Sequence, residues 1–416
     1  MKHVLTSTGM LALGAVALHA TDPQLTRQNT GRAWSLSATV RGFYDDNITT
    51  SPDRLKERSF GVQVSPSVSL NLPLEQTFIS LGYTYSLMWY ENREPKNIDQ
   101  SHIFNGQLTH QFSPRHTLNV KDTFIVSSEP SVVEPDIQTS PLRTEGSIKR
   151  NIGIIDDIFQ ITPTVGLGFG YNNNWYDYEQ ENVPGGFGSR SALLDRIEQL
   201  IRGDVRYTFT PTLIGLVGYT YGIVSYTGDE LIAPGLMSDD RNNTSQYGYL
   251  GVDYDITARL RSSVRLGAQY TDYKNANDSN VNPYADASLT YLYMQGSSLL
   301  LGVRHARNAT DVSAVDTSSG LPTLDQITTA VYTKISHQIT PHLTGSLLGQ
   351  AQFSTFNQGS YGDQSETLWL AGVNLEYMFN RHLSADIGYN YDVLNSDVPN
   401  REYSRNRVYL GLRLTY

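Results

Sequence analysis

The chain has 416 residues, of which 39% are hydrophobic and 17% charged, and its formal net charge is -10. This hydrophobic fraction excludes a protein built from many membrane-spanning helices but fits a membrane β-barrel, whose inner wall and loops are polar. The negative charge argues against nucleic acid as a partner, and the absence of cysteine fits an exported chain and excludes a lipidated cysteine anchor.

The amino terminus has the pattern of a secretory signal. A short polar start precedes an apolar run at residues 11–18, which ends near small residues. We expect cleavage after Ala20, with Ala17 as the alternative, so that residues 1–20 form the signal peptide and 21–33 a periplasmic lead. The apolar run is far shorter than the roughly 20 residues of a spanning helix. Because no other long apolar run follows, a membrane protein with this sequence must cross as strands.

Residues 34–416 are expected to form these strands, because apolar and polar residues alternate with a period of two over most of the range. At its start, an apolar face of Trp34, Leu36, Ala38 and Val40 alternates with a polar face of Ser35, Ser37, Thr39 and Arg41. The same rhythm recurs along the chain, which indicates strands with one lipid-facing and one lumen-facing side.

Short turns separate the strands in pairs. They are expected around Pro73, Pro114, Asp156, Pro211, Ala258, Gly296, Pro341 and Arg381. Several have an apolar residue on each side of the tight turn, as in Phe209-Thr-Pro-Thr-Leu213, which is typical of a short hairpin. A regular repeat of this kind could also indicate a propeller, but each repeat here holds two long strands instead of four short ones.

Longer segments rich in Asn, Asp, Gly and Ser lie between the turns, among them 45–57, 129–142 and 394–402. Short turns on one side and long loops on the other are typical of outer-membrane barrels. The alternation predicts a transmembrane antiparallel up-and-down β-barrel of about 18 strands over residues 34–416. We expect the short turns to be periplasmic and the long loops extracellular.

The last stretch, 407–416, carries an apolar row on one face. The row consists of Val408, Leu410, Leu412, Leu414 and Tyr416. A strand that ends in an aromatic residue resembles the closing strand of a bacterial outer-membrane barrel. The resemblance implies that these residues are an assembly signal read by the β-barrel assembly machinery, and that the protein lies in the outer membrane with its lipid and lipopolysaccharide as partners.

Two further regions resemble the putative β-barrel porin 2 family. They are Leu36–Asn47, and Pro283–Tyr291 followed by Arg304–Asn308. The family includes barrels of exopolysaccharide export systems, so the resemblance implies a conduit for a polymer or a solute. It supplies no catalytic residues.

Signatures of enzymes and metal sites are absent from the sequence. It has no His-Glu-x-x-His, no Gly-x-Ser-x-Gly and no P-loop, and its nine histidines are scattered. We therefore expect no enzyme, no metal and no cofactor. Gly166, Gly168 and Gly170 lie within a predicted strand, so they are not a dinucleotide loop. We expect a neighbour's large side chain to fold over them; the alternative is close approach of a loop or of cargo.

Strand parity places charged side chains in the lumen. The predicted pore-lining residues are Arg41, Lys121, Lys149, Arg202, Arg206, Arg261, Arg265, Arg304, Lys334, Glu376, Asp386 and Arg413, and further inward acids are Glu198, Asp204, Asp253, Asp255 and Asp286. Asp255 should pair with Arg261 across a turn, and Arg413 should lie between the like charges of Glu376 and Asp386. Unpaired basic groups would concentrate anions in the lumen, whereas a balanced wall would show no preference.

Asp122 and Arg150 interrupt the predicted outward apolar face on two consecutive strands. One explanation is a bulge that changes the phase of a strand. The other is an ion pair between Asp122 and Arg150 at a contact with a subunit or partner.

Taken together, the pattern favours an outer-membrane channel that passes a hydrophilic solute or polysaccharide, by exopolysaccharide export or by porin-like diffusion. A general small-solute porin is a second possibility. A structural or adhesive surface barrel with a blocked lumen is a third, since an open lumen and one plugged by a loop both fit the sequence.

Overall fold

The computed structural model describes residues 33–416 except 95, 128–146, 180–187, 313–314 and 317–319. The predicted signal peptide, the periplasmic lead up to residue 32 and the long segment at 129–142 lie outside the described residues.

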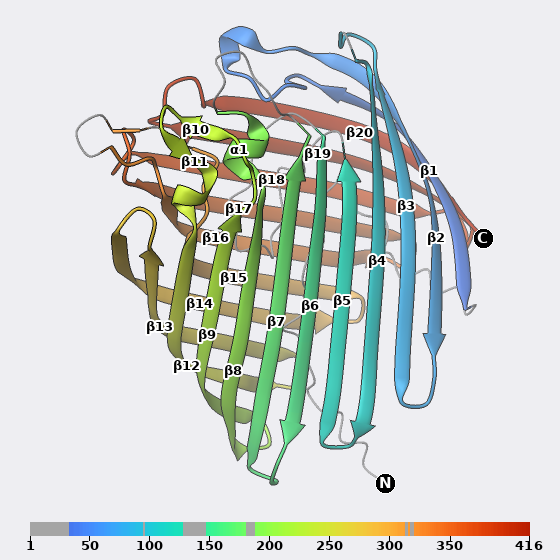
Figure 1. Cartoon of the computed structure of the whole chain (residues 1–416). Helices are drawn as coiled ribbons and strands as arrows, with labels where there is room; N and C mark the ends of the chain where they lie inside the picture. Colours follow the sequence, from blue (N-terminus) through green and yellow to red (C-terminus); the bar gives the residue numbers. More distant parts are fainter. Residues whose placement is uncertain (1–32, 95, 128–146, 180–187, 313–314, 317–319) are drawn as a thin grey trace.

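Eighteen antiparallel strands form one closed barrel (Figure 1). Its strands are β1 (Trp34–Asp45), β2 (Ser59–Pro73), β3 (Thr77–Tyr90), β4 (Ile98–Ser113), β5 (His116–Ser127), β6 (Ile148–Gln160), β7 (Val165–Tyr178), β8 (Arg196–Thr210), β9 (Leu213–Tyr226), β12 (Asn243–Thr257), β13 (Leu260–Tyr273), β14 (Asp278–Met294), β15 (Ser297–Asn308), β16 (Asp325–Thr340), β17 (Leu343–Asn357), β18 (Ser365–Met378), β19 (Leu383–Ser396) and β20 (Tyr403–Thr415). Each strand pairs with the next along the chain, and pairing of β1 with β20 closes the sheet. The predicted fold and strand number are confirmed.

Shorter elements lie in the loops. They are η2 (Asp53–Leu55), α1 (Arg190–Leu194), the hairpin of β10 (Leu231–Ala233) and β11 (Leu236–Met237), and η3 (Ser238–Arg241). The hairpin and α1 lie together at the end of the barrel opposite the short turns (Figure 1). Within the described ranges, no helix is long and apolar enough to cross a bilayer.

The predicted short turns match the structure at seven of eight positions. The exception is Asp156, which lies inside β6 and pairs with Asn119 and Gly170. The turn instead occupies residues 161–164, around Pro163. The prediction was wrong because an Asp-Asp pair was interpreted as a turn, whereas Asp156 is a buried, inward-facing strand residue.

The two faces of the sheet differ in the way that a membrane barrel requires. On β20, Val408, Leu410 and Leu412 are exposed by 45 to 62%, while Tyr409, Arg413 and Thr415 on the opposite face are buried. The apolar face is therefore the outer one, which meets lipid, and the polar face lines the lumen. The alternation arises because successive side chains of a strand point to opposite sides.

Candidate functional site

The inner wall carries most of the charged residues that the sequence placed there. Strand register and burial put Arg41, Lys121, Arg202, Arg206, Arg261, Arg265, Arg304, Lys334, Glu376, Asp386 and Arg413 on this polar face. Their position defines the lumen wall as the candidate functional site, and their role in passage stays a prediction.

Lys149 differs from the expectation. It pairs in register with Val126 and Asp177 on the outer face, and its ammonium lies 3.6 Å from Asp177 and 3.3 Å from Glu179. The neighbouring Arg150 is the inward residue and is buried. The phase of β6 was misjudged because its inward face carries isoleucines, among them Ile148, which packs under the extracellular loops.

Neither of the two explanations given for Asp122 and Arg150 is present: the register of β5 and β6 has no bulge, and the two residues form no ion pair. The Arg150 guanidinium lies 4.9 Å from the centre of the Tyr176 ring, and one of its Nη atoms donates to the Tyr176 hydroxyl at 3.3 Å. Asp122 is exposed on the outer face, where its carboxylate accepts from Asn151 Nδ2 at 3.1 and 3.0 Å. The two charges therefore lie on opposite sides of the wall.

An alternating row of acids and arginines crosses the inner wall from β6 to β13. Its contacts are Asp156–Arg202 at 2.6 Å, Arg202–Asp204 at 3.6 Å, Asp204–Arg206 at 3.3 Å, Arg206–Asp253 at 2.7 Å and Asp253–Arg265 at 2.7 Å. Each arginine in this row thus contacts at least one carboxylate. Asp156 was not predicted to line the lumen, because it was interpreted as part of a turn and the phase of β6 was misjudged.

The glycines of β7 make room for this row. Gly170 lies in register between Asp156 of β6 and Arg202 of β8, so the arginine reaches its partner across β7. A Cβ at Gly170 would lie 3.0 Å from the Arg202 guanidinium, and one at Gly168 would lie 2.6 Å from an Asp204 carboxylate oxygen. This geometry agrees with the prediction that neighbouring side chains cover the glycines.

The same arrangement occurs where the barrel closes. Gly411 of β20 lies in register between Arg41 of β1 and Asp386 of β19, and Arg41 Nε donates to Asp386 across it at 2.9 Å. Asp386 also faces Glu376, as expected, and the charge of Arg413 acts on Glu376. Arg41 is thus the direct partner of Asp386, a role that sequence analysis had given to Arg413.

Two further ion pairs join residues that the sequence placed on the inner face. Arg261 Nε lies 3.2 Å from Asp255, which confirms that pair, and Arg304 lies 3.7 Å from Asp286 in the register of β14 and β15. Most basic side chains of the wall therefore have carboxylate neighbours. The positive and negative charges of the inner wall are thus closer to balance than to an excess of positive charge.

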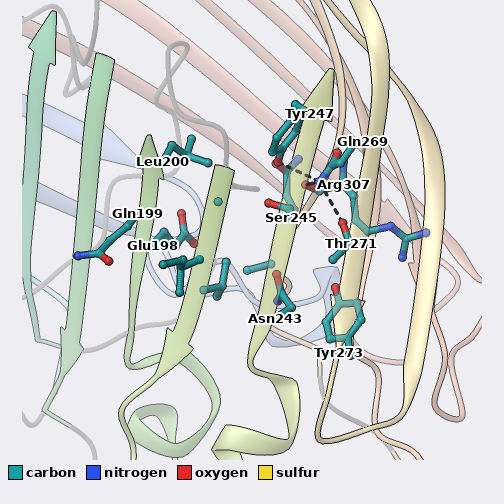
Figure 2. Close-up of a pocket in the computed structure, with 15 residues that line it drawn as sticks. Glu198, Gln199, Leu200, Asn243, Ser245, Tyr247, Gln269, Thr271, Tyr273 and Arg307 are labelled. Carbon is teal, nitrogen blue, oxygen red and sulfur yellow. Dashed lines mark hydrogen bonds between the residues drawn. The ribbon is translucent and has the colours of Figure 1, made fainter. Parts of the chain in front are cut away.

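A pocket lies in the inner wall near the extracellular end (Figure 2). Its lining includes Ser245 and Tyr247 of β12 together with Gln269 and Thr271 of β13. The Gln269 amide donates to the Tyr247 hydroxyl at 2.9 Å and accepts from the backbone N–H of Arg307 at 2.9 Å. The lining combines hydroxyl and amide groups with the charged Glu198 and Arg307 and with apolar residues such as Leu200.

Side chains able to hold a metal do not gather in the parts of the chain that the structure describes, where no group of three His, Asp or Glu residues has the required geometry.

Comparison with known proteins agrees with this architecture. The model of the family described as putative beta-barrel porin 2 matches residues 316–416. The chain is a porin-like β-barrel of the bacterial outer membrane. The match confirms a resemblance to this family over the last quarter of the chain, whereas Leu36–Asn47 and Pro283–Tyr291, on which the sequence resemblance was based, lie outside it. Outer-membrane lipid surrounds the outer face.

Solved porin structures are also similar to this porin-like barrel. Pseudomonas aeruginosa OccK2 (OpdF) is 13% identical with a TM-score of 0.46, and Acinetobacter baumannii OccAB2 is 12% identical with a TM-score of 0.45; each match covers 92% of this chain and 98% of the other. Pseudomonas aeruginosa OpdK with vanillate is 11% identical with a TM-score of 0.43, covering 92% and 99%. No curated protein matches the sequence significantly.

Proposed function

We propose that the chain is an outer-membrane channel that passes a hydrophilic solute or a polysaccharide. The observation that supports this most directly is the closed barrel of eighteen strands with a polar inner wall. Barrels of 16 to 18 strands are wide enough to enclose an aqueous lumen. Exopolysaccharide export, which the family resemblance implies, and porin-like diffusion are the two forms of this function.

The charge pairing of the wall supports weak ion selectivity. The Arg202, Arg206 and Arg265 side chains all contact carboxylates, so little uncompensated positive charge is left to concentrate anions. We therefore propose cargo that is polar and largely uncharged, in place of the anionic cargo that an unpaired basic ladder would select.

Purified protein in planar lipid bilayers tests the proposal. We expect discrete conductance steps and a small reversal potential across a salt gradient. Proteoliposome swelling with sugars of graded size then reports whether uncharged solutes pass. Protein that is folded by heat-modifiability on gels but gives no conductance and no swelling would refute passage.

A second candidate function is a structural or adhesive surface barrel with a blocked lumen. It is favoured by loops that fold onto the inner wall, since Leu194 of α1 packs against Ile148, Tyr176 and Tyr178 there. The absence of both conductance and proteoliposome swelling, together with binding of the intact protein to a surface partner, would favour this function over a channel.

A further inference from the structure

The sheet opens between β14 and β15 toward the extracellular end of the barrel. The ladder between β14 and β15 ends at the pair Ala285–His305. β14 nevertheless stays paired with β13 as far as Asp278, and β15 stays paired with β16 as far as Asn308. The last residues of β15 therefore leave β14 but stay in the sheet through β16, which remains paired with β17 as far as Asp325.

These residues lie against the inner face of β13 and β14. Gln269 of β13 accepts from the backbone N–H of Arg307 at 2.9 Å and donates to its carbonyl at 3.3 Å. The Arg307 guanidinium donates to Asn282 of β14 at 3.2 Å and pairs with Asp325 of β16. Because Gln269 and Asn282 are buried residues of the inner face, the end of β15 lies on the lumen side of β13 and β14.

The residues that follow β15 contact two arginines from other loops. Arg241, which is fully buried, donates to the carbonyl of Thr310 at 2.5 Å and to that of Leu193 at 3.0 Å. Arg401 binds the carboxylate of the next residue, Asp311, with both terminal nitrogens at 2.9 Å. Adjacent residues of one segment thus bind loops from two different parts of the barrel.

The positions of these loops show how the segment runs. Arg241 lies two residues before β12 begins, and Arg401 lies two residues before β20 begins. The strand order separates β12 from β20 by eight positions in a barrel of eighteen strands. The two loops therefore originate on nearly opposite sides of the wall. Since Thr310 and Asp311 are consecutive, the three loops must converge over the mouth.

We propose that residues 306–312, called the strap from here on, set the size limit of the extracellular entrance, and that the Asp311–Arg401 pair is its tether. This proposal rests on the proposed channel function and names the residues that determine its specificity for size. Asn308 and Ala309 of the strap line the same pocket as Ser245 of the wall, so the strap forms part of its boundary.

The geometry of the tether favours a closed strap at rest. The Asp311 side chain is only 4% exposed and is held by two charge-assisted hydrogen bonds, which are stronger than neutral ones. Burial opposes the charge on Arg401, but the carboxylates of Asp311 and Glu366 outweigh that effect and raise the pKa of Arg401. The Arg401 guanidinium therefore stays charged over the working pH range.

Asp311→Asn releases the tether with little change in volume. Arg401 keeps its contact with Glu366 at 3.2 Å, so the substitution does not leave the guanidinium without an acid. A matched control is Asp99→Asn, because Asp99 is also held by both terminal nitrogens of one arginine, Arg93, at 2.6 Å each. Asp99 is the second residue of β4, away from the strap.

Thiol labelling measures access to the pocket beneath the strap. The chain contains no cysteine, so Ser245→Cys introduces a single thiol at a buried position of the pocket. A small methanethiosulfonate and a bulky maleimide–polyethylene glycol are applied to protein in proteoliposomes. In the Asp311→Asn background we expect the bulky reagent to react roughly tenfold faster or more, since one charge-assisted pair shifts an open–closed equilibrium by about that factor. The Asp99→Asn background should react as Ser245→Cys alone.

Equal bulky-reagent rates in the Asp311→Asn and Asp99→Asn backgrounds would overturn the proposal, as would fast labelling of Ser245→Cys alone. If Asp311→Asn fails to form a heat-modifiable barrel, Arg241→Gln releases the neighbouring Thr310 and must raise the rate instead. Unit conductance distinguishes failure of the proposed channel function from failure of the proposed role of the strap. Faster labelling without conductance in any variant supports the strap as a cover and refutes passage, whereas conductance with unchanged labelling refutes the strap alone.

Discussion

Gly411→Ala should destabilise the barrel at its closing seam. Arg41 of β1 and Asp386 of β19 meet across β20, and both side chains are less than 10% exposed. A Cβ at Gly411 would lie 2.5 Å from Arg41 Cγ and 2.6 Å from an Asp386 carboxylate oxygen. Neither distance is tolerable, so the pair must shift and its 2.9 Å hydrogen bond must lengthen.

The magnitude follows from three effects. Overpacking a close-packed site costs about 1–3 kcal/mol. Breaking a buried ion pair by removing one partner costs about 3–5 kcal/mol, and a displaced pair beside an aqueous lumen loses only a part of this. Replacing glycine by alanine within a strand raises the free energy of unfolding by about 0.5–1 kcal/mol. The overpacking cost and the partial loss of the ion pair together exceed the gain from replacing glycine. We therefore expect Gly411→Ala to lower the free energy of unfolding by about 1–3 kcal/mol.

The chain offers a matched control one register pair away. Gly42 of β1 faces outward opposite Leu410, and a Cβ there would meet nothing within 4 Å. Gly42→Ala should therefore raise stability by about 0.5–1 kcal/mol. Urea-induced unfolding in lipid bilayers, read by tryptophan fluorescence and by heat-modifiability, measures both variants.

A combination with Asp386→Ala tests whether the pair carries the effect. If the new methyl group acts by displacing Asp386, the cost of Gly411→Ala must shrink in the Asp386→Ala background. Equal stability of Gly411→Ala and Gly42→Ala, or full additivity with Asp386→Ala, would refute the reasoning.

Three further predictions concern the outer face, assembly and selectivity. Asp122→Leu should stabilise the barrel by about 1–3 kcal/mol, because it removes a charge from the lipid face; unchanged urea unfolding would contradict this. Tyr416→Asp should leave much of the protein unassembled in the periplasm, which cell fractionation measures. A normal amount of heat-modifiable barrel in the outer membrane would show that the apolar row is no assembly signal. Arg265→Ala combined with Arg304→Ala leaves acids such as Asp286 with fewer basic neighbours, so the reversal potential should move toward cation preference; an unmoved potential would show that these pairs do not set the charge of the lumen.

The strand pattern was predictable because it is local. A period of two, with short turns between strands, marks an amphipathic sheet without reference to any distant residue. The row on β20, from Val408 to Tyr416, shows how clear the signal becomes where one face meets lipid and the other meets water. The number of strands then follows from counting turns.

The phase of β6 was not predictable in the same way. Ile148 and Ile152 are buried on the inner face, where Ile148 packs with Tyr178 and Leu194. An inward-facing isoleucine is favourable only because a loop folds into the mouth and covers part of the wall. That contact depends on tertiary structure, and the alternation rule assumes a wall that faces water.

The partners of the inward charges depend on contacts even more distant in sequence. Arg41 and Asp386 are 345 residues apart, and they meet only because the first and last strands pair and Gly411 leaves the space between them open. Parity states which face a charge lies on, but the register of three adjacent strands decides whether it is neutralised. The same argument applies to Asp156 and Arg202 across Gly170. Balanced charge in this lumen is therefore a property of the closed sheet, and it arises where a small residue on the middle strand lets an arginine reach an acid two strands away.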